Sequence, residues 1–530
     1  MELAIANSEL KDIPIAAELA KKQRSISVAE FFEKNRHILG FESPARSLIT
    51  CVKEAVDNSL DACEEAGILP DIWVEIKKID EKNYRIIVED NGPGIVRTQI
   101  PLVFGKLLYG SRFHTLKQSR GQQGLGISAA VLYAQITSGK PVKIISKIAV
   151  DEPAYYFELF INTQKNEPEI VVEKTIEWYQ TGTRIELEME GTYIRGKKSV
   201  QEYLKATSIV NPHARIRLIE PNGNEILYER LINELPKQSI EIKPHPHGID
   251  IGTLMKMLQQ SRNRKLGTFL VNEFKSIGQH TACNICREAK LDINKPPWEI
   301  TLEEAKRLLM AFKKVKISSP SLDCLSPITE ELIQKSLERE YKPDFIATTT
   351  RAGVYAGNPF IVEVGLAYGG SINSTERIEI LRFANRVPLL YQQGACAITQ
   401  AIERINWKYY GLEQANNSSL PSGPFMILIH IASTKVPFTS ESKDAIASIP
   451  EILEEVELAI RETARKLSNF LARKRQMAEV NKKKNIFLAY NPLLAQALEC
   501  LTGRPAKDIE KQLLQILDKR YSNLRGGEGE

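Results

Sequence analysis

Cysteine is scarce in this sequence: there are seven among 530 residues, and an odd number argues against a disulfide framework. The one C-x-x-C pair, Cys283 and Cys286, follows His280, but no second pair stands at the spacing that a zinc site needs. We therefore expect small, core-facing residues of a helix there. No run of about 18 uninterrupted apolar residues is present, and residues 1–22 lack the apolar segment of a signal peptide. These absences predict a cytoplasmic protein with no membrane association.

Neither sign of charge dominates. The net charge is +5 and the pI is near 8.6, which permits contact with nucleic acid without requiring it. Four basic runs stand in the later part of the chain, at residues 262–265, 313–316, 473–475 and 482–484. Such runs are more often solvated surface than binding sites, but four together favour an anionic polymer as partner. The length predicts two to four domains.

Two common nucleotide-binding motifs are also missing. There is no Walker-type G-x-x-x-x-G-K-[ST], and the glycines at 121–126 follow a polar segment rather than the strand that a dinucleotide fingerprint needs. Three other segments stand in a fixed order: EAVDNSLDA at 54–62, DNGPGI at 90–95 and GQQGLGIS at 121–128. A Thr-Gly-Thr follows at 181–183. Each is a weak signal by itself, and the combination is specific.

The chemistry of these segments suits a bound phosphate. Apolar residues recur every three or four positions from 44 to 65 and predict a helix on which Glu54 and Asn58 share one face. A carboxylate beside an amide oxygen can hold a water molecule and a metal ion. The glycines at 121–126 precede the small, apolar run 127–131, which predicts a helix start, and the N–H groups of a helix start bind phosphate.

The three segments resemble the ATP site of GHKL (Bergerat) ATPases, the family of gyrase, MutL, the heat-shock chaperone and sensor histidine kinases. The resemblance implies ATP and Mg²⁺ as cofactors, Glu54 as general base and Asn58 as the Mg²⁺ ligand. It implies that Asp90 binds the adenine amine and that Thr183 closes the far side of the adenine pocket. The other nucleotide-binding residues that we expect are Gly92, Gly94, Ser111, Arg112, Gly121, Gln122, Gln123, Gly124, Leu125, Gly126, Ile127 and Ser128.

The order of the expected elements gives the fold class. Strand patterns at 73–76, 84–88, 142–146, 155–161, 170–172 and 183–189, with helices between them, predict an α/β sandwich with an antiparallel or mixed sheet. The proline-rich segment 243–248 cannot continue a regular element and is interpreted as a linker. Mostly helical patterns follow over 249–340. Strand patterns then return at 360–366, 378–384 and 425–432, and a long helix is predicted over 450–485.

The downstream segments indicate the branch of the family. Residues 269–278 and the helix after them resemble a helix-two-turns-helix module. Residues 383–391 and 433–438 resemble the transducer domain of DNA topoisomerase VI B subunits. The resemblance covers roughly residues 25–480, and we expect four parts: a GHKL ATPase domain with an N-terminal strap (1–242), a helix-two-turns-helix domain (243–315), an α/β transducer domain (316–485) and a C-terminal helical tail (486–530).

This resemblance implies the ATP-hydrolysing B subunit of a type IIB topoisomerase, which relaxes positive and negative supercoils and decatenates DNA by double-strand passage. Cleavage would belong to a separate A subunit in an A2B2 heterotetramer. ATP binding would drive closure of a B–B homodimer, and double-stranded DNA would be a partner. Lys435, in Ser-Thr-Lys, would reach the γ-phosphate from the transducer domain and act in catalysis.

Other classes share parts of this pattern. A MutL-type or chaperone-type ATPase should not have the helical insert at 249–312. A histidine kinase needs a phosphoacceptor histidine on a dimerisation helix, and the surroundings of His37 do not match that context. A non-enzymatic bridge for the cleavage subunit is opposed by the intact Glu54, Asn58, Asp90 and Gly124.

Overall fold

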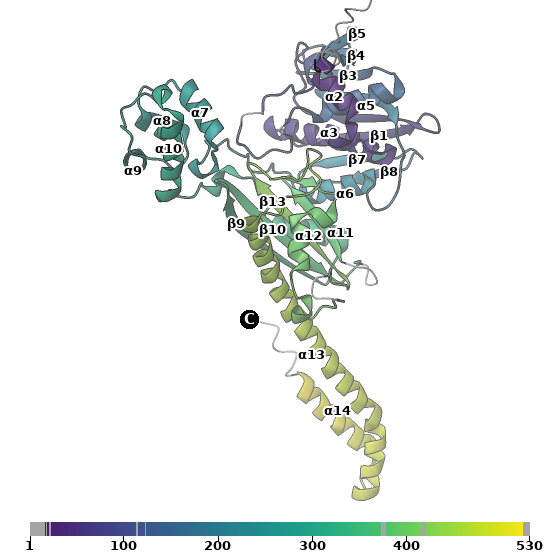
Figure 1. Cartoon of the computed structure of the whole chain (residues 1–530). Helices are drawn as coiled ribbons and strands as arrows, with labels where there is room; N and C mark the ends of the chain where they lie inside the picture. The colour runs from purple at the N-terminus through teal and green to yellow at the C-terminus, as the bar shows by residue number, and fades with distance from the viewer. Residues whose placement is uncertain are drawn as a thin grey trace, which may run out of the picture.

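A computed structural model of the chain describes residues 16, 19–20, 23–112, 115–121, 123–372, 378–415 and 419–522. Figure 1 shows two parts built on β-sheets in contact with each other, a small helical part to one side, and a long helix that extends away from the second sheet. The α/β fold class predicted from the sequence is confirmed.

The first sheet has eight strands in the order β5-β4-β3-β6-β2-β1-β7-β8. All neighbours are antiparallel except β1 and β7, which are parallel, so the sheet is mixed, one of the two forms that the sequence left open. Each of the six predicted strand patterns lies within one of its strands. The strands are β1 (Asp71–Lys78), β2 (Asn83–Asp90), β3 (Val142–Lys147), β4 (Ala154–Asn162), β5 (Glu167–Ile176), β6 (Gly182–Glu190), β7 (Arg215–Ile219) and β8 (Glu225–Tyr228).

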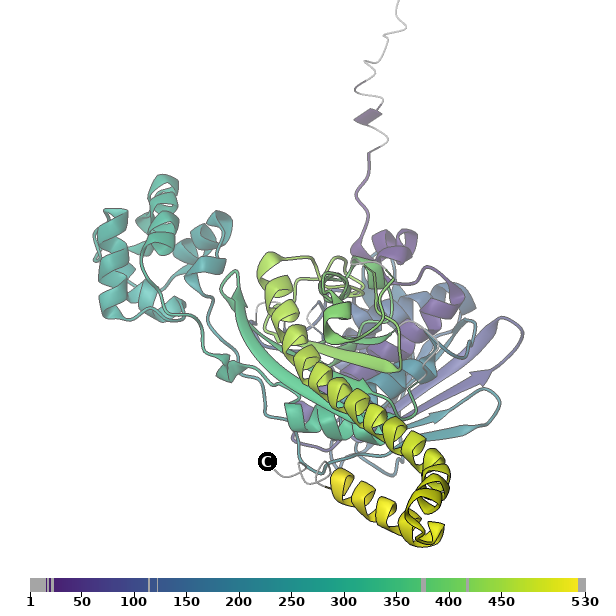
Figure 2. The ribbon, with the colours of Figure 1, turned by 90° about the horizontal axis from the view of Figure 1, so that it is seen from below.

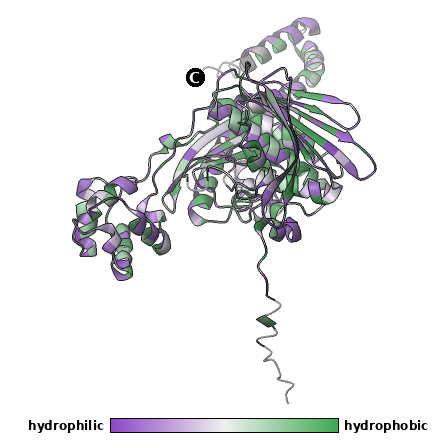
Figure 3. Ribbon diagram, turned by 90° about the horizontal axis from the view of Figure 1, so that it is seen from above, coloured by the Kyte–Doolittle hydropathy of each residue, from purple (hydrophilic) through white to green (hydrophobic). Residues whose placement is uncertain are grey.

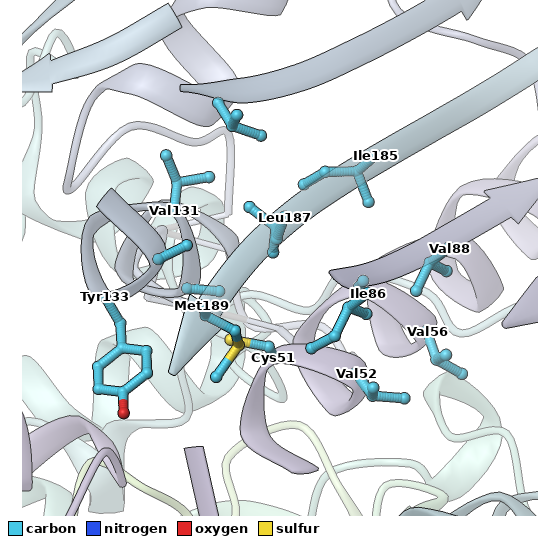
Figure 4. Close-up of a cluster of buried hydrophobic side chains, with 14 of the residues drawn as sticks. Cys51, Val52, Val56, Ile86, Val88, Val131, Tyr133, Ile185, Leu187 and Met189 are labelled. Carbon is cyan, nitrogen blue, oxygen red and sulfur yellow. The ribbon is translucent and has the colours of Figure 1, made fainter. Parts of the chain in front are cut away.

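Helix α3 (Pro44–Glu65) has the bounds that its periodicity predicted. Ser43 caps it by accepting a hydrogen bond from the Arg46 N–H, and Pro44 suits the first helical turn. Its apolar face packs on the strands with α5, as the buried side chains in Figure 4 show. The other helical elements of this part are α2 (Val28–Lys34), η1 (Arg36–Leu39), α4 (Ile100–Gly105), α5 (Gly126–Ser138) and α6 (Val200–Val210).

The helical part stands apart from both sheets (Figures 1 and 3). It has a core of its own, because its buried apolar residues cluster only with one another. One predicted detail is half right: Cys286 is buried in this core, whereas Cys283 is exposed on the same helix. The elements are α7 (Ile251–Gln260), α8 (Leu266–Glu273), α9 (Gln279–Ala289), η3 (Pro297–Glu299) and α10 (Leu302–Lys314).

The sequence predicted that the proline-rich segment 243–248 has no regular structure, and this is only partly right. The segment contains one turn of 3₁₀ helix, η2 (Pro246–Gly248). The His245 ring contacts the Ser318 carbonyl at 3.1 Å, and the His247 ring contacts the Phe312 carbonyl at 2.9 Å. A 3₁₀ turn accepts proline at its start, where no N–H is needed, so the prolines end α-helix and strand without excluding this turn.

The second sheet has five strands in the order β12-β11-β13-β10-β9. Three of them coincide with the predicted strand patterns, and the long strand β9 was missed. Its sequence, FIATTTRAGVY, is rich in threonine and half-exposed, because β9 is the edge strand. The strands are β9 (Phe345–Tyr355), β10 (Asn358–Tyr368), β11 (Glu379–Ala384), β12 (Val387–Pro388) and β13 (Phe425–Ser433).

Both faces of the second sheet are covered, which is why every residue of β13 is buried. One face packs against α12 (Ala397–Glu403) and α13 (Pro450–Thr502). The other face packs against α11 (Glu330–Tyr341) and against α6 of the first part, so it joins the two sheets. In Figure 2, α13 crosses strands β9 and β10 and continues beyond the sheet to α14 (Ala506–Ser522), which folds back on it.

The long helix exceeds its predicted range: it continues through residue 485 to Thr502, so the expected domain boundary falls inside one helix. Among the described residues, none of the helices combines the length and the hydropathy that a membrane crossing requires.

Candidate ATP site

A cavity of about 900 Å³ lies between α3, α5 and the loops around them, and loops of the second sheet close one side of it. Segments that are far apart in the sequence meet here, as the three motifs predicted. The predicted site residues that line the cavity are Glu54, Asn58, Asp90, Gly94, Ser111, Arg112, Gly121, Gln123, Gly124, Leu125, Gly126, Ile127, Ser128 and Thr183. Gln122 lies outside the described residues.

Glu54 and Asn58 project into the cavity from successive turns of α3. The Lys53 ammonium lies 3.5 Å from Glu54 Oε1. Burial opposes the charge of Lys53, but the carboxylates of Glu54, Asp57 and Asp444 outweigh it, and the net effect raises the lysine pKa. A Cβ atom at Gly126 would overlap the Glu54 carboxylate, so any other residue there would displace this carboxylate from its position at the start of α5.

Asp90 is buried at the end of β2, and its carboxylate is held on both oxygens. It accepts hydrogen bonds from Ser59 Oγ at 2.8 Å, from the Gly92 N–H at 3.0 Å and from the Thr183 N–H at 3.1 Å. Burial raises its pKa, and these three donors oppose the rise. Gly92 is not part of the cavity lining; it acts on the site by donating to Asp90. A carboxylate has about four acceptor positions, so one is left for a further donor.

Arg112 lines the cavity, but its guanidinium forms ion pairs with carboxylates of α3. It pairs with Asp61 through Nη1 and with Glu65 Oε1 through Nη2 at 2.7 Å. The sequence predicted an arginine facing phosphate, and in this structure it faces two carboxylates instead. A phosphate would have to compete with both of them.

A buried ion cluster that the sequence did not reveal lies directly before the glycine loop. The Arg120 guanidinium is 3% exposed and contacts Asp61 Oδ1 at 2.7 Å and both oxygens of Glu64 at 2.7 and 2.9 Å. It also donates to Asn211 Oδ1 at 2.6 Å. The ring of His213 lies 2.8 Å from Glu64. Burial lowers the pKa of Arg120, but Glu64 and Asp61 outweigh burial and raise it, so Arg120 stays charged.

The lysine that reaches the cavity from the second sheet is Lys443. Its Nζ donates to the Arg120 carbonyl at 3.0 Å and it is part of the cavity lining. Burial lowers its pKa, Lys53 lowers it further, and Glu54 opposes both. Lys435 is exposed and lies outside the lining, which corrects the position expected for it. Its backbone N–H donates to Ser433 Oγ at 3.2 Å.

The loop that contains Lys443 is itself held by the first part. Asp444 pairs with Arg46 on the first turn of α3, and the Arg46 guanidinium also lies 4.5 Å from the centre of the Tyr391 ring. The Lys443 N–H donates to the Ser440 carbonyl at 3.1 Å, with Lys443 in the left-handed conformation at φ +54°. Ion pair and turn together aim the lysine at the glycine loop.

The donor set fits a magnesium ion that is shared with a nucleotide. Mg²⁺ keeps several waters and takes one or two protein oxygens together with phosphate oxygens. The Asn58 amide oxygen faces Gly121 across the cavity, 3.8 Å from where a Cβ would stand, and Glu54 lies one turn away. The described residues contain no group of three His, Cys, Asp or Glu side chains able to hold a metal alone.

Comparison with known proteins agrees with this geometry. Residues 44–190 match the family described as histidine kinase-, DNA gyrase B- and HSP90-like ATPase, and residues 320–483 match the family described as topoisomerase VI B subunit, transducer. Fold and site thus define an ATP-binding protein of the GHKL class with a transducer domain built on the second sheet.

Relatives that match over most of their length identify the branch. The chain is 59% identical over 507 residues to the B subunit of type 2 DNA topoisomerase 6 from Methanococcoides burtonii, covering 95% of this chain and 81% of that protein. It is 52% identical over 502 residues to the protein of the same name from Archaeoglobus fulgidus, covering 94% and 83%. The chain belongs to the topoisomerase VI B subunit family.

Proposed function

We propose that this chain hydrolyses ATP as the B subunit of a type IIB DNA topoisomerase and couples hydrolysis to the passage of one duplex through a break in another. The observation that supports this most directly is the composition of the cavity wall. The ATPase part supplies Glu54, Asn58 and the glycine loop, and the transducer supplies Lys443. A nucleotide bound here would contact both parts, so its hydrolysis can change how they fit together.

In this proposal each side chain has a distinct role. Glu54 orients the attacking water and accepts its proton. Asn58 would hold Mg²⁺, which would neutralise charge on the phosphates. The N–H groups at the start of α5 bind phosphate oxygens, and Asp90 accepts a hydrogen bond from the adenine amine. Lys443 takes over the role first expected of Lys435 and stabilises charge on the terminal phosphate.

The remaining residues predicted from the sequence complete the proposed site. Ser111, Arg112, Gly121, Gln122 and Gln123 belong to a lid over the phosphates, Gly92 and Gly94 let the chain pass close to the adenine, and Thr183 closes the pocket. The four-part division at residues 242, 315 and 485 is retained as part of the proposal, with its last boundary inside α13. It agrees with the separate core of the helical part.

The partners follow from the family. We infer an A subunit that cleaves DNA, an A2B2 heterotetramer, a B–B dimer that closes when ATP binds, and double-stranded DNA as substrate. The cytoplasm is the proposed location, in agreement with seven cysteines that are all unpaired. Contact with DNA through basic runs predicts binding that weakens steeply with salt.

Supercoil relaxation tests the proposal. The chain mixed with the A subunit of a relative should relax supercoiled DNA only when ATP and Mg²⁺ are both present. The chain alone should hydrolyse ATP and leave DNA intact. Relaxation that proceeds without ATP, or an absence of ATP turnover in the complex, would contradict the assignment.

A further inference from the structure

A two-residue turn of the transducer reaches across to the ATPase part. Asn385 and Arg386 connect β11 to β12, with Ala384 paired to Val387 on either side. Their φ values are +48° and +65°, the left-handed pair that a tight hairpin of this kind requires. Glycine and asparagine both accept this conformation readily. Asparagine in addition has a side-chain amide that can form hydrogen bonds.

The Asn385 amide makes hydrogen bonds to both parts of the molecule. Its Oδ1 accepts from the Ser433 N–H at 2.9 Å and its Nδ2 donates to the Ser433 carbonyl at 3.0 Å, which ties it to the end of β13. The same Nδ2 donates to the Ser119 carbonyl at 3.1 Å. Asn385 is buried, so this last bond is a specific contact to the segment two residues before Gly121.

Neighbouring contacts fix the same segment. The Gln118 side chain accepts from the Ser326 N–H at 2.8 Å and donates to the Ser326 carbonyl at 3.0 Å. The Arg120 carbonyl accepts from Lys443. Each of three consecutive residues before the glycine loop is therefore bonded to the transducer or to the segment that leads into it.

These contacts differ in how they respond to a nucleotide. Lys443 is a cation, and a phosphate in the cavity competes with the Arg120 carbonyl for it. The partners of Asn385 are backbone groups outside the cavity, and no phosphate replaces them. We therefore expect Asn385 to keep its hydrogen bonds to Ser119 and Ser433 when a nucleotide binds, while Lys443 exchanges the Arg120 carbonyl for a phosphate oxygen.

We propose that Asn385 is a positioning residue that sets the distance between the end of β13 and the start of the glycine loop. When the loop moves around a nucleotide, the amide passes that movement to β13, and it returns transducer movement to the loop. The inference rests on the proposed ATPase function and deepens it, because it names where in the chain nucleotide binding and transducer position are linked.

Two variants separate the amide from the turn. Asn385→Gly keeps the left-handed backbone and removes the three hydrogen bonds. Asn385→Asp keeps the shape and places an oxygen where Nδ2 faces two carbonyls. Gln414 provides a matched control, since its buried amide also makes three bonds, to Trp407, Ile405 and Ser419, all inside the transducer. The control variants are Gln414→Ala and Gln414→Glu.

The assay is ATP turnover and supercoil relaxation by the complex with the A subunit. We expect Asn385→Gly to raise the KM for ATP roughly three- to tenfold, because of the three bonds lost only the one to the Ser119 carbonyl joins the two parts, and one buried neutral hydrogen bond has an effect of this size. We expect a lower ratio of relaxation to ATP hydrolysed, and a larger loss for Asn385→Asp. The Gln414 variants should lower Tm at least as much and leave KM and the ratio unchanged.

Two results would overturn the inference: wild-type KM and ratio in both Asn385 variants, or equal losses in the Gln414 variants. ATP turnover by the wild-type complex in the same assay distinguishes this failure from a wider one. If the wild-type complex hydrolyses ATP and relaxes DNA while the Asn385 variants behave as wild type, only the inference fails. If the wild-type complex shows no ATP turnover, the proposed function fails and the inference fails with it.

Discussion

Replacing Lys443 by methionine should separate the two lysines that the sequence offers as phosphate contacts. Methionine keeps the length of the side chain and removes its charge, and the left-handed backbone at residue 443 is equally strained in both. Without a nucleotide the change removes one hydrogen bond, to the Arg120 carbonyl. With a nucleotide it removes a charge-assisted bond to phosphate, which typically contributes about 1.5–3 kcal/mol.

That free energy corresponds to a loss of roughly 10- to 150-fold in kcat/KM for ATP. Lys435→Met, the control, should stay within about twofold of wild type, as expected for an exposed surface residue. Lys443→Arg should recover only part of the activity, because a planar guanidinium does not replace a compact ammonium. The measurements are steady-state ATP hydrolysis and relaxation with the A subunit. A large loss in Lys435→Met with near-normal Lys443→Met would refute the assignment of Lys443.

Three further changes test other parts of the structure. Glu54→Ala should bind nucleotide, measured by calorimetry, and lose about 10²–10⁴-fold in hydrolysis; turnover near wild type would remove Glu54 as the base. Arg120→Met leaves the Glu64 carboxylate without its main partner and should cost about 3–5 kcal/mol in the free energy of unfolding, measured with urea; a cost under about 1 kcal/mol would show that solvent reaches the pair. Burial lowers the pKa of His430, opposed by Glu363, so the unfolded chain binds more protons and stability falls as the pH drops below about 6.5. His430→Gln should reduce that slope by up to about 1.4 kcal/mol per pH unit, and an unchanged slope would mean that His430 is not the group that titrates.

Local patterns predicted the elements around the site well. The bounds of α3 follow from the capping residue Ser43, from Pro44 in the first turn and from the apolar spacing of the helix. All three are local features that can be read from neighbouring residues. The strands β1 and β2 follow from alternation across a short turn. The strand β9 was missed because an edge strand with several threonines has no strong apolar alternation.

Contacts between the two parts could not be predicted in the same way. Lys435 and Lys443 both follow β13, and the sequence does not tell which of them faces the glycine loop. The choice depends on the turn at 440–443 and on the ion pair between Arg46 and Asp444, whose partners are 398 residues apart. Arg112 and Arg120 likewise look equivalent in the sequence, and both pair with carboxylates of α3, yet only Arg120 is almost wholly buried.

The position of Lys443 also bears on how a change at the nucleotide site could move the long helix α13. Helix α13 begins at Pro450, seven residues after Lys443, and its first turns are packed on the transducer sheet. At 1.5 Å per residue its 53 residues extend about 80 Å, so a tilt of about 5° at its start moves its far end by about 7 Å. The buried residues of α13 are dense up to Leu471 and sparse beyond it, so the outer half can follow such a tilt without breaking a core. A small tilt at the start of α13 would therefore be enlarged at its far end, provided that the loop at 440–444 and the sheet move as one body. The Arg46–Asp444 pair and the Asn385 amide join that body to the nucleotide site at two separate points.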